Sequence, residues 1–489
     1  MKIDSKARIV LVGAGIGGVT AAALLARRGY TVTLIEEQAY PGGCAATFER
    51  QGFRFDAGAT VGCGFHLKGP LARLGDELGI AWSLMPSSVA WEYRCGDISF
   101  QLSHSRAGIL SVFPASRPFW QEQDRLASLL WSIAGETMPW PPSSLADYRS
   151  LAAKATGKLS TSLSLLGFSG KTALQWLAMH GLDRDPDFVR FIDAQLLISV
   201  QTTAGDANAL FAAIALDLPV RGTDRVTGGI GRVAELLAAS IESDGGSVIY
   251  NSRVSRLERQ NGRVVSVVTR DGKRYPADLV IANLTPESLQ ELLKEDGSLR
   301  LNRQPAPLWG AFVLYLGVDE DVFGDVTCNH LQLIQPEGQL GEGRSLFISV
   351  SPSDDSLRAP EGYRAVTVST HTRPGLWFDA LKEGREAYES LKASYTSQML
   401  SLLETRFKGI SSRCRVAFAA TPVTFERYTG RKDGYVGGYP QRSLFRVRGP
   451  GTPVKNLFLS GDSVFPGQSL PGVVSGVRRL VEIIEKMTG

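Results

Sequence analysis

A glycine motif near the N-terminus constrains the fold of this chain more than any other feature. Residues 8–36 read RIVLVGAGIGGVTAAALLARRGYTVTLIE, in which Gly13, Gly15 and Gly18 follow a short apolar run. The run predicts a buried strand, the alanine- and leucine-rich segment after the glycines predicts a helix, and the alternating residues 30–35 predict a second strand. This order of elements indicates a β-strand, helix, β-strand unit of the kind that binds dinucleotides.

The glycines have distinct physical roles in such a unit. Gly13 permits the tight turn after the strand, and Gly15 lets the backbone approach a pyrophosphate at the positive end of the helix. Gly18 allows close packing of the helix on the strand. Ile16 and Gly17 complete the predicted phosphate-binding turn.

An acidic residue closes the unit. Glu36 ends the second strand about 20 residues after the last glycine, where a carboxylate that binds a ribose hydroxyl is expected. A glycine-rich turn without a ligand is the alternative interpretation. Strand, glycines, helix, strand and acid nevertheless occur in the required order, which favours a dinucleotide site.

A second group of small residues favours a flavin dinucleotide over a nicotinamide one. Gly42, Gly43 and Cys44 lie in PGGCA, and Ala59 and Thr60 end the segment DAGAT. FAD must pass from the first loop into the interior of the protein, so small residues are needed where its ribityl chain and ring approach the backbone. Because no second cysteine lies near Cys44 in the sequence, we interpret it as a packing residue rather than a redox thiol.

A C-terminal segment, NLFLSGDSVFPGQSLPGVVSGV, completes the predicted cofactor site. Its first residues predict a strand that leads to Gly461 and Asp462, and an acid there suits a contact with the ribityl chain or a phosphate. Gly472 and Val473 lie in the glycine-rich start of the last helix. The N–H groups and dipole of such a helix favour the electron-rich edge of a reduced flavin.

Composition excludes several other classes of protein. Hydrophobic residues make up 43% of the 489 residues and charged residues 21%, which is typical of a globular chain. The formal net charge is +4 and no block of Lys and Arg stands out, so we expect no nucleic-acid partner. The cysteines form no CxxC pair and the histidines form no HxxxH pair, so neither a metal site nor a disulfide framework is expected.

The glycine motif, the PGGCAATF and DAGAT segments and the C-terminal segment resemble the bacterial phytoene desaturase and carotenoid isomerase family of FAD oxidoreductases. Three middle segments resemble its carotenoid C-3′,4′ desaturase branch: GAFVLYLGVDE (310–320), GRSLFISVSPSDD (343–355) and ATPVTFERYTGRKDGYVGG (420–438). The resemblance implies an α/β flavoprotein of the two-dinucleotide-binding-domain type, with a Rossmann-like FAD domain and an inserted α+β substrate domain. It implies non-covalent FAD, and it places Val254 against the adenine.

The resemblance also implies how the chain is divided. An FAD-binding domain is expected from residues 1–75, 222–300 and 435–489, and a substrate domain from residues 76–221 and 301–434. Residues 95–220 match the family least. The chain also lacks a histidine that many relatives have before the C-terminal Pro-Gly, so no role of that histidine is carried over.

The activity that the resemblance implies is carotenoid desaturation, in which a polyene chain loses a hydride to flavin N5 and a neighbouring proton. A membrane quinone or oxygen would then take up the electrons. Cis–trans isomerisation with reduced FAD and a non-enzymatic lipid- or prenyl-binding protein of the same fold are alternatives. The catalytic residues are not predicted, and Asp193 and Glu426 are only candidates for a general base.

The aromatic, charge-poor region 104–180 suggests where a lipid substrate would enter. The resemblance implies that this region contacts the bilayer, and Trp131, Trp140 and Phe168 are the predicted membrane-contact residues. An ordinary aromatic core is the alternative. Glycines interrupt the apolar N-terminus and no window of about 20 apolar residues lacks charge, so we expect neither a signal peptide nor a spanning helix. The predicted location is the cytoplasmic face of a membrane, with peripheral attachment.

Overall fold

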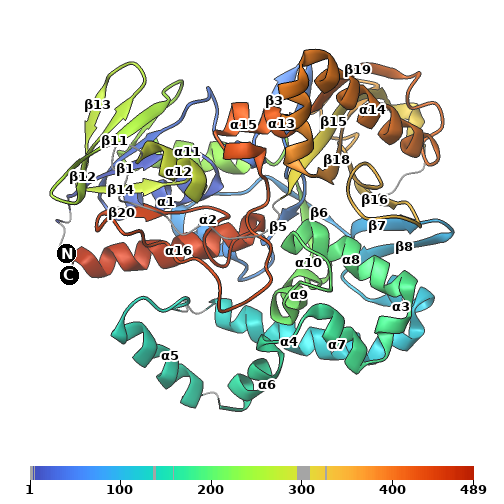
Figure 1. Cartoon of the computed structure of the whole chain (residues 1–489), viewed down its shortest axis with the longest axis horizontal. Helices are drawn as coiled ribbons and strands as arrows, with labels where there is room; N and C mark the ends of the chain where they lie inside the picture. Colours follow the sequence, from blue (N-terminus) through green and yellow to red (C-terminus); the bar gives the residue numbers. More distant parts are fainter. Residues whose placement is uncertain are drawn as a thin grey trace.

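A five-stranded parallel sheet forms the centre of one half of the molecule, on the left of Figure 1. The computed structural model describes residues 4, 6–135, 139–157, 159–293, 309–324 and 328–488. Neighbouring strands of this sheet are parallel throughout, in the order β10-β2-β1-β14-β20. The strands are β1 (Arg8–Val12), β2 (Thr31–Ile35), β10 (Ser247–Ile249), β14 (Leu279–Ala282) and β20 (Leu457–Leu459).

Both faces of this sheet are covered, which explains why its strands read as nearly continuous apolar runs. One face packs against α1 (Ile16–Arg27), α11 (Arg232–Ser243) and α16 (Ser469–Thr488). The other face packs against a small antiparallel sheet and α12 (Pro286–Leu292). The predicted β-strand, helix, β-strand unit is confirmed, and Gly29 follows α1 with a φ of +86°.

The small sheet corrects one sequence prediction. Residues 247–256 read as a single strand, but the chain divides there into β10 and β11, which belong to different sheets. Asn251, with a φ of +53°, lies in the turn between them. The hairpin predicted at 271–272 is present, with Gly272 at a φ of +85°. The small sheet is formed by β11 (Val254–Gln260), β12 (Arg263–Thr269) and β13 (Arg274–Pro276).

A seven-stranded sheet forms the other half of the molecule, at the upper right of Figure 1. Its order is β19-β15-β18-β17-β16-β7-β8, and the parallel pairing of β7 with β16 joins two distant parts of the chain. Alternate residues of β15 face opposite sides: Phe312 packs under α13 (Pro374–Glu383) and α14 (Arg385–Glu404), whereas Val313 faces the first half. The strands are β7 (Val89–Cys95), β8 (Ile98–Ser103), β15 (Gly310–Asp319), β16 (His330–Ile334), β17 (Ser345–Val350), β18 (Tyr363–Thr372) and β19 (Cys414–Ala420).

Aromatic side chains of the region 104–180 form much of the core of a helical layer below this sheet, and the predicted contact of this region with a membrane stays a prediction. Phe168 is 7% exposed, Trp131 donates to Asp217, and Trp140 donates to the carbonyl of Leu444. Short helices that pack together need large apolar side chains between them, so a charge-poor aromatic pattern is equally typical of a core. The layer contains α3 (Ala107–Val112), α4 (Arg117–Gly135), α5 (Leu145–Gly157), α6 (Leu159–Ser169), α7 (Ala173–Met179), α8 (Pro186–Val200), α9 (Ala209–Ala215) and α10 (Leu218–Arg221).

Shorter elements join the two halves. One of them, α15 (Pro422–Thr429), lies between the two large sheets in Figure 1. The domain boundaries remain predictions, and the one at 300/301 lies outside the described residues. Within the described part of the chain, no helix combines the length and the apolar character that crossing a bilayer requires. The remaining elements are α2 (Pro70–Leu78), β3 (Thr47–Arg50), β4 (Phe53–Asp56), β5 (Gly62–Cys63), β6 (Leu84–Ser87) and β9 (Thr223–Val226).

Candidate functional site

A cavity of about 460 Å³ lies where the two halves meet, at the carboxyl ends of β1, β2, β14 and β20. In parallel α/β sheets this edge is where ligands bind. Most of the residues predicted for the cofactor line the cavity: Gly13, Gly15, Ile16, Gly17, Glu36, Gly42, Gly43, Cys44, Ala59, Thr60, Val254, Gly461, Asp462 and Val473. Gly18 and Gly472 lie outside this lining. The contact that each residue makes with a cofactor remains a prediction.

The glycine turn has the geometry that phosphate binding requires. Gly13 has a φ of +93°, and helix α1 begins after Gly15, whose position provides no side-chain cap. The first N–H groups of α1 therefore have no partner within the helix and point to the cavity side. A Cβ on Gly18 would lie 2.0 Å from the carbonyl oxygen of Gly13, so only glycine permits this packing.

Asn283, just past β14, fills the space beside these glycines. Its amide nitrogen would lie 2.6 Å from a Cβ on Gly15, and its amide oxygen 2.6 Å from a Cβ on Gly17. A Cβ on Gly461 would lie 2.7 Å from the same oxygen. Gly15 and Gly17 from the first turn and Gly461 from the C-terminal segment thus form one cradle around a single amide. Sequence reasoning did not select Asn283, although its place after a buried strand of the parallel sheet was a usable signal.

Glu36 is fixed on the wall of the cavity by the backbone. Its Oε2 accepts a 2.6 Å hydrogen bond from the N–H of Ala14, and its Oε1 accepts one of 2.9 Å from the N–H of Gln38. Burial raises the pKa of this carboxyl, and the two backbone donors oppose that shift. The carboxylate keeps further lone pairs, which suit the predicted ribose hydroxyl.

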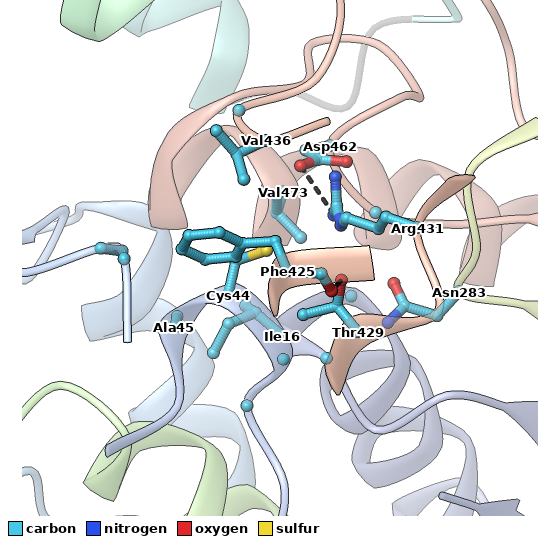
Figure 2. Close-up of a pocket in the computed structure, with 18 of the residues that line it drawn as sticks. Ile16, Cys44, Ala45, Asn283, Phe425, Thr429, Arg431, Val436, Asp462 and Val473 are labelled. Atoms are coloured by element: carbon cyan, nitrogen blue, oxygen red, sulfur yellow. Dashed lines mark hydrogen bonds and ion pairs between the residues drawn. The ribbon is translucent and has the colours of Figure 1, made fainter. Parts of the chain in front are cut away.

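Arg431 and Asp462 form an ion pair inside the cavity, with 2.8 Å between Nη2 and Oδ2 (Figure 2). Cys44 lies nearby, and burial raises the pKa of its thiol, which agrees with an unreactive packing residue. Sequence reasoning selected Asp462 and Cys44 but missed Arg431. The arginine lies in a loop after α15, within the segment 420–438 that resembles the desaturase branch, but that resemblance assigned it no role.

Two buried glutamine side chains lack a partner for their acceptor atoms. Gln201 and Gln468 line the cavity, each is 6% exposed, and neither Oε1 accepts a hydrogen bond from the described residues. Gln468 donates through Nε2 to the carbonyl of Tyr439. Because buried polar atoms are normally hydrogen-bonded, these two require a donor from a bound molecule or from water.

Comparison with known proteins assigns the family. The sequence profile described as "Flavin containing amine oxidoreductase" matches residues 16–479. The chain belongs to this family. FAD is therefore its cofactor and the protein is an FAD-dependent oxidoreductase, so the expected flavoprotein fold and cofactor are confirmed. The glycine cradle, the uncapped start of α1 and the orphaned glutamine acceptors all fit FAD, whose ring carries an N–H donor.

Curated relatives match almost the whole chain at low identity. Prolycopene isomerase of Daucus carota is 27% identical over 96% of this chain and 78% of the relative. Phytoene desaturase (neurosporene-forming) of Rhodobacter capsulatus is 23% identical, covering 98% and 94%. The 1-hydroxycarotenoid 3,4-desaturase of a Flavobacterium species is 23% identical, covering 95% and 96%. The resemblance found in the sequence is thus confirmed.

Solved structures share the fold. An oxidoreductase from Methanosarcina mazei superimposes with a TM-score of 0.64 at 19% identity, covering 97% of this chain and 100% of that chain. Putrescine oxidase bound to putrescine gives 0.63 at 17% identity, covering 98% and 99%. At such identities the likeness establishes the architecture alone.

The remaining wall of the flavoenzyme cavity is one face of the seven-stranded sheet. Ala311 and Val313 of β15, and Ser369 and His371 of β18, are alternate residues that share this face. Phe347 of β17 also lines the cavity. Burial lowers the pKa of His371 to about 4, so its imidazole is neutral at neutral pH.

The two side chains considered as general bases do not line the cavity. Asp193 accepts a 2.7 Å hydrogen bond from the N–H of Ala204 and so braces the end of α8. Glu426 accepts one from the N–H of Asp433. Among the described residues Glu426 forms no ion pair with Arg427, whose guanidinium lies over the ring of Tyr428.

Proposed function

We propose that the protein is an FAD-dependent carotenoid oxidoreductase that desaturates a polyene chain. The support comes from the curated relatives, several of which are desaturases or isomerases named for carotenoids, and from the wall of the cavity. Side chains such as Val61, Trp91, Ile198, Leu218 and Phe347 give that wall an apolar surface. Such a surface suits a hydrocarbon chain, whose burial is favoured in proportion to its area.

In this proposal the cofactor lies along the first half of the cavity. The turn at residues 13–17 and Asn283 hold the diphosphate, Glu36 holds the ribose and Val254 packs on the adenine. Gly42, Gly43, Cys44, Ala59, Thr60 and Val473 enclose the rest. When bound, FAD would supply the two-electron acceptor for the hydride that the proposed desaturation removes from the polyene.

The protein residues mainly orient the chain and exclude water. A cation on a conjugated polyene is delocalised and loses a neighbouring proton readily, so a strong base is not needed. Among the described residues of the sheet face that lines the cavity, His371 carries the titratable side chain, and its imidazole is neutral. Gln201 and Gln468 provide fixed polar contacts at the edge of the flavin.

Isomerisation of a polyene is the second candidate. It is supported by the prolycopene isomerases, one of which is 27% identical over 96% of this chain, while a phytoene dehydrogenase of Streptomyces griseus is 28% identical over 95%. In that case reduced FAD would lend and recover electrons without net oxidation. The same apolar wall would serve both reactions.

We infer peripheral attachment to the cytoplasmic face of a membrane, with a membrane quinone or oxygen as electron acceptor. A water-insoluble substrate must be collected from a bilayer. Leu145 and Tyr148 of α5 and Leu166 of α6 are 78%, 60% and 62% exposed, respectively. We add these side chains to the proposed contact because they lie on the outer surface of the helical layer, whereas Phe168 is buried.

The direct test is pigment analysis in a polyene-producing host with and without the chain. Desaturation is expected to shift absorption to longer wavelength and to lower the pigment mass by two hydrogens per new double bond. A change in retention at unchanged mass would support isomerisation. Unchanged pigments from several polyene hosts, with yellow FAD-containing protein present, would overturn the proposed substrate class.

A further inference from the structure

We propose that Arg431 is a cofactor-binding residue whose guanidinium, held in place by Asp462, binds the diphosphate of FAD. This assignment depends on the cofactor and not on the proposed polyene substrate. It adds a binding residue from the loop after α15 to a site otherwise made from three segments of the FAD half. The position, the neighbours, the charge and the hydrogen-bond donors of Arg431 support this assignment.

The position of the Arg431 guanidinium relative to the first turn of α1 supports the assignment. A Cβ on Gly17, in the first turn of α1, would lie 2.7 Å from the backbone nitrogen of Gly461. The next residue, Asp462, holds Arg431 at 2.8 Å. The guanidinium is therefore tied to the part of the cavity where the start of α1 receives the diphosphate.

The neighbours of Arg431 on either side along the cavity also support the assignment. Gly430, next to Arg431, accepts a hydrogen bond from the hydroxyl of Ser288. Ser288 lies in the first turn of α12, the helix that follows Asn283 in the chain. Cys44, on the opposite side, is close enough to Arg431 for the two groups to interact electrostatically. Arg431 thus lies between the segment that ends β14 and the segment of small residues around the flavin, which is where the diphosphate of an extended FAD passes.

The charged side chains that line the cavity give further support. Four carboxylates line the cavity, Glu36, Glu37, Glu291 and Asp462, together with two guanidinium groups. One of these, on Arg253, is half exposed and paired with Glu37. Arg431 is only one-fifth exposed. A diphosphate adds further negative charge, so the interior cation is needed to offset it.

The number of N–H donors on the Arg431 guanidinium also fits a diphosphate. A guanidinium has five N–H groups in a planar fork that matches phosphate geometry. Asp462 accepts from Nη2, and among the described residues no second carboxylate pairs with Arg431. Because the side chain lines the cavity, its remaining donors are available to a ligand there.

Binding measurements on the full-length apoprotein test the assignment without any need for activity. FAD, ADP and riboflavin are titrated separately into the wild type and Arg431→Gln. We expect the variant to bind FAD and ADP about ten- to a hundredfold more weakly, as for the loss of a charge-assisted hydrogen bond, and riboflavin within about threefold of wild type. FAD affinity should also depend less on salt concentration, because one phosphate contact is gone.

Two further variants serve as controls. Arg442→Gln removes a guanidinium that pairs with Asp206 at 3.1 Å outside the cavity, and it should leave all three affinities unchanged. Arg431→Lys keeps the charge without the fork, so its FAD affinity should lie between those of the wild type and Arg431→Gln. It also provides a readout if the glutamine variant fails to fold by circular dichroism.

Three results would overturn the assignment. The first is unchanged FAD and ADP affinity in folded Arg431→Gln. The second is an equal loss for riboflavin, which would place the guanidinium at the flavin ring. The third is a loss that disappears when Arg431→Gln is made in an Asp462→Asn background, because Arg431 would then act only as the partner of Asp462. Wild-type protein that binds FAD normally but leaves polyenes unchanged would instead count against the proposed substrate.

Discussion

The carboxylate of Asp56 and the guanidinium of Arg358 form an ion pair with 3.0 Å between Oδ2 and Nη2, and each side chain is less than a tenth exposed. The other oxygen of Asp56 accepts hydrogen bonds from the hydroxyl of Thr47 and the N–H of Ile230. The pair therefore fastens the segment around β3 and β4 to the chain before α11 and to the chain that leads into β18. It fixes how the two halves enclose the cavity.

Replacing Asp56 with Ala is expected to destabilise the protein strongly. The substitution leaves a buried guanidinium unpaired, which typically costs about 3–5 kcal/mol. Urea unfolding of the apoprotein measures this loss. Asp206→Asn, which breaks an exposed pair with Arg442, is the matched control and should cost about 0–1 kcal/mol. Equal losses in the two variants would contradict the role given to Asp56.

Replacing Glu36 with Ala is expected to weaken FAD binding while the fold persists. One hydrogen bond to a charged acceptor contributes roughly 1.5–3 kcal/mol, or about ten- to a hundredfold in affinity. Titration of apoprotein with FAD checks this value. Glu37→Ala is the control, because Glu37 also lines the cavity but pairs with Arg253. If Glu36→Ala binds FAD as tightly as the wild type does, Glu36 is not the ribose ligand.

His330 predicts a specific dependence of stability on pH. Its Nδ1 lies 2.9 Å from the hydroxyl of Ser349, which donates to Thr60 on the cavity wall. Burial lowers the pKa of His330 from 6.5 to about 4. Above pH 6.5 the imidazole is neutral in both the folded and the unfolded state. Between pH 6.5 and about 4 only the unfolded state takes up the proton, so stability falls as the pH falls.

The size of this effect follows from the shift in pKa. A difference of this order corresponds to roughly 3 kcal/mol at the acid end of the range. His330→Asn keeps a polar group near Ser349 but cannot titrate. Its free energy of unfolding should therefore decline less than that of the wild type between pH 7 and pH 4. Parallel curves for the two proteins would show that His330 is not buried in its neutral form.

Membrane attachment is expected to depend on exposed leucines rather than on the aromatic core. Replacing Leu145 and Leu166 together with Ser should reduce liposome flotation about tenfold or more, because each large apolar side chain contributes up to about 1.5–3 kcal/mol when fully buried. FAD content should not change. Leu381→Ser on α13, where the leucine is 43% exposed, is the control. Wild-type protein that never floats would refute membrane attachment itself.

The cofactor half was largely predictable because its signals are local. Gly13, Gly15 and Gly18 are needed for conformation and close packing within one short segment, so their spacing carries the information. Arg431 was not predictable in this way. Its partner Asp462 lies in another part of the chain, and although the segment 420–438 resembles the desaturase branch, nothing in its spacing marks Arg431 as a cofactor ligand.

The helical layer shows a different limit of sequence reasoning. A charge-poor stretch with large aromatic side chains is typical both of a protein core and of a membrane-binding surface. The sequence does not show whether other helices cover these side chains, and only that distinguishes the two cases. Trp120 lies in the interior against Phe188 and Phe191 of α8, and Trp176 lies there against Phe119 of α4 and Phe168 of α6. The pairing of β7 with β16 was equally hidden, since register between distant strands leaves no mark within either strand.

The order of strands in the parallel sheet has a consequence for biosynthesis. β20 comes near the end of the chain, yet it pairs with β14 and leads directly into Asp462 and α16. At about 5–20 residues per second, the ribosome takes roughly ten to thirty seconds to pass from one strand to the other. Throughout that interval the nascent sheet has an open edge, and α1 lacks α16, one of the helices that pack against it. Cofactor capture must therefore wait for the last part of translation.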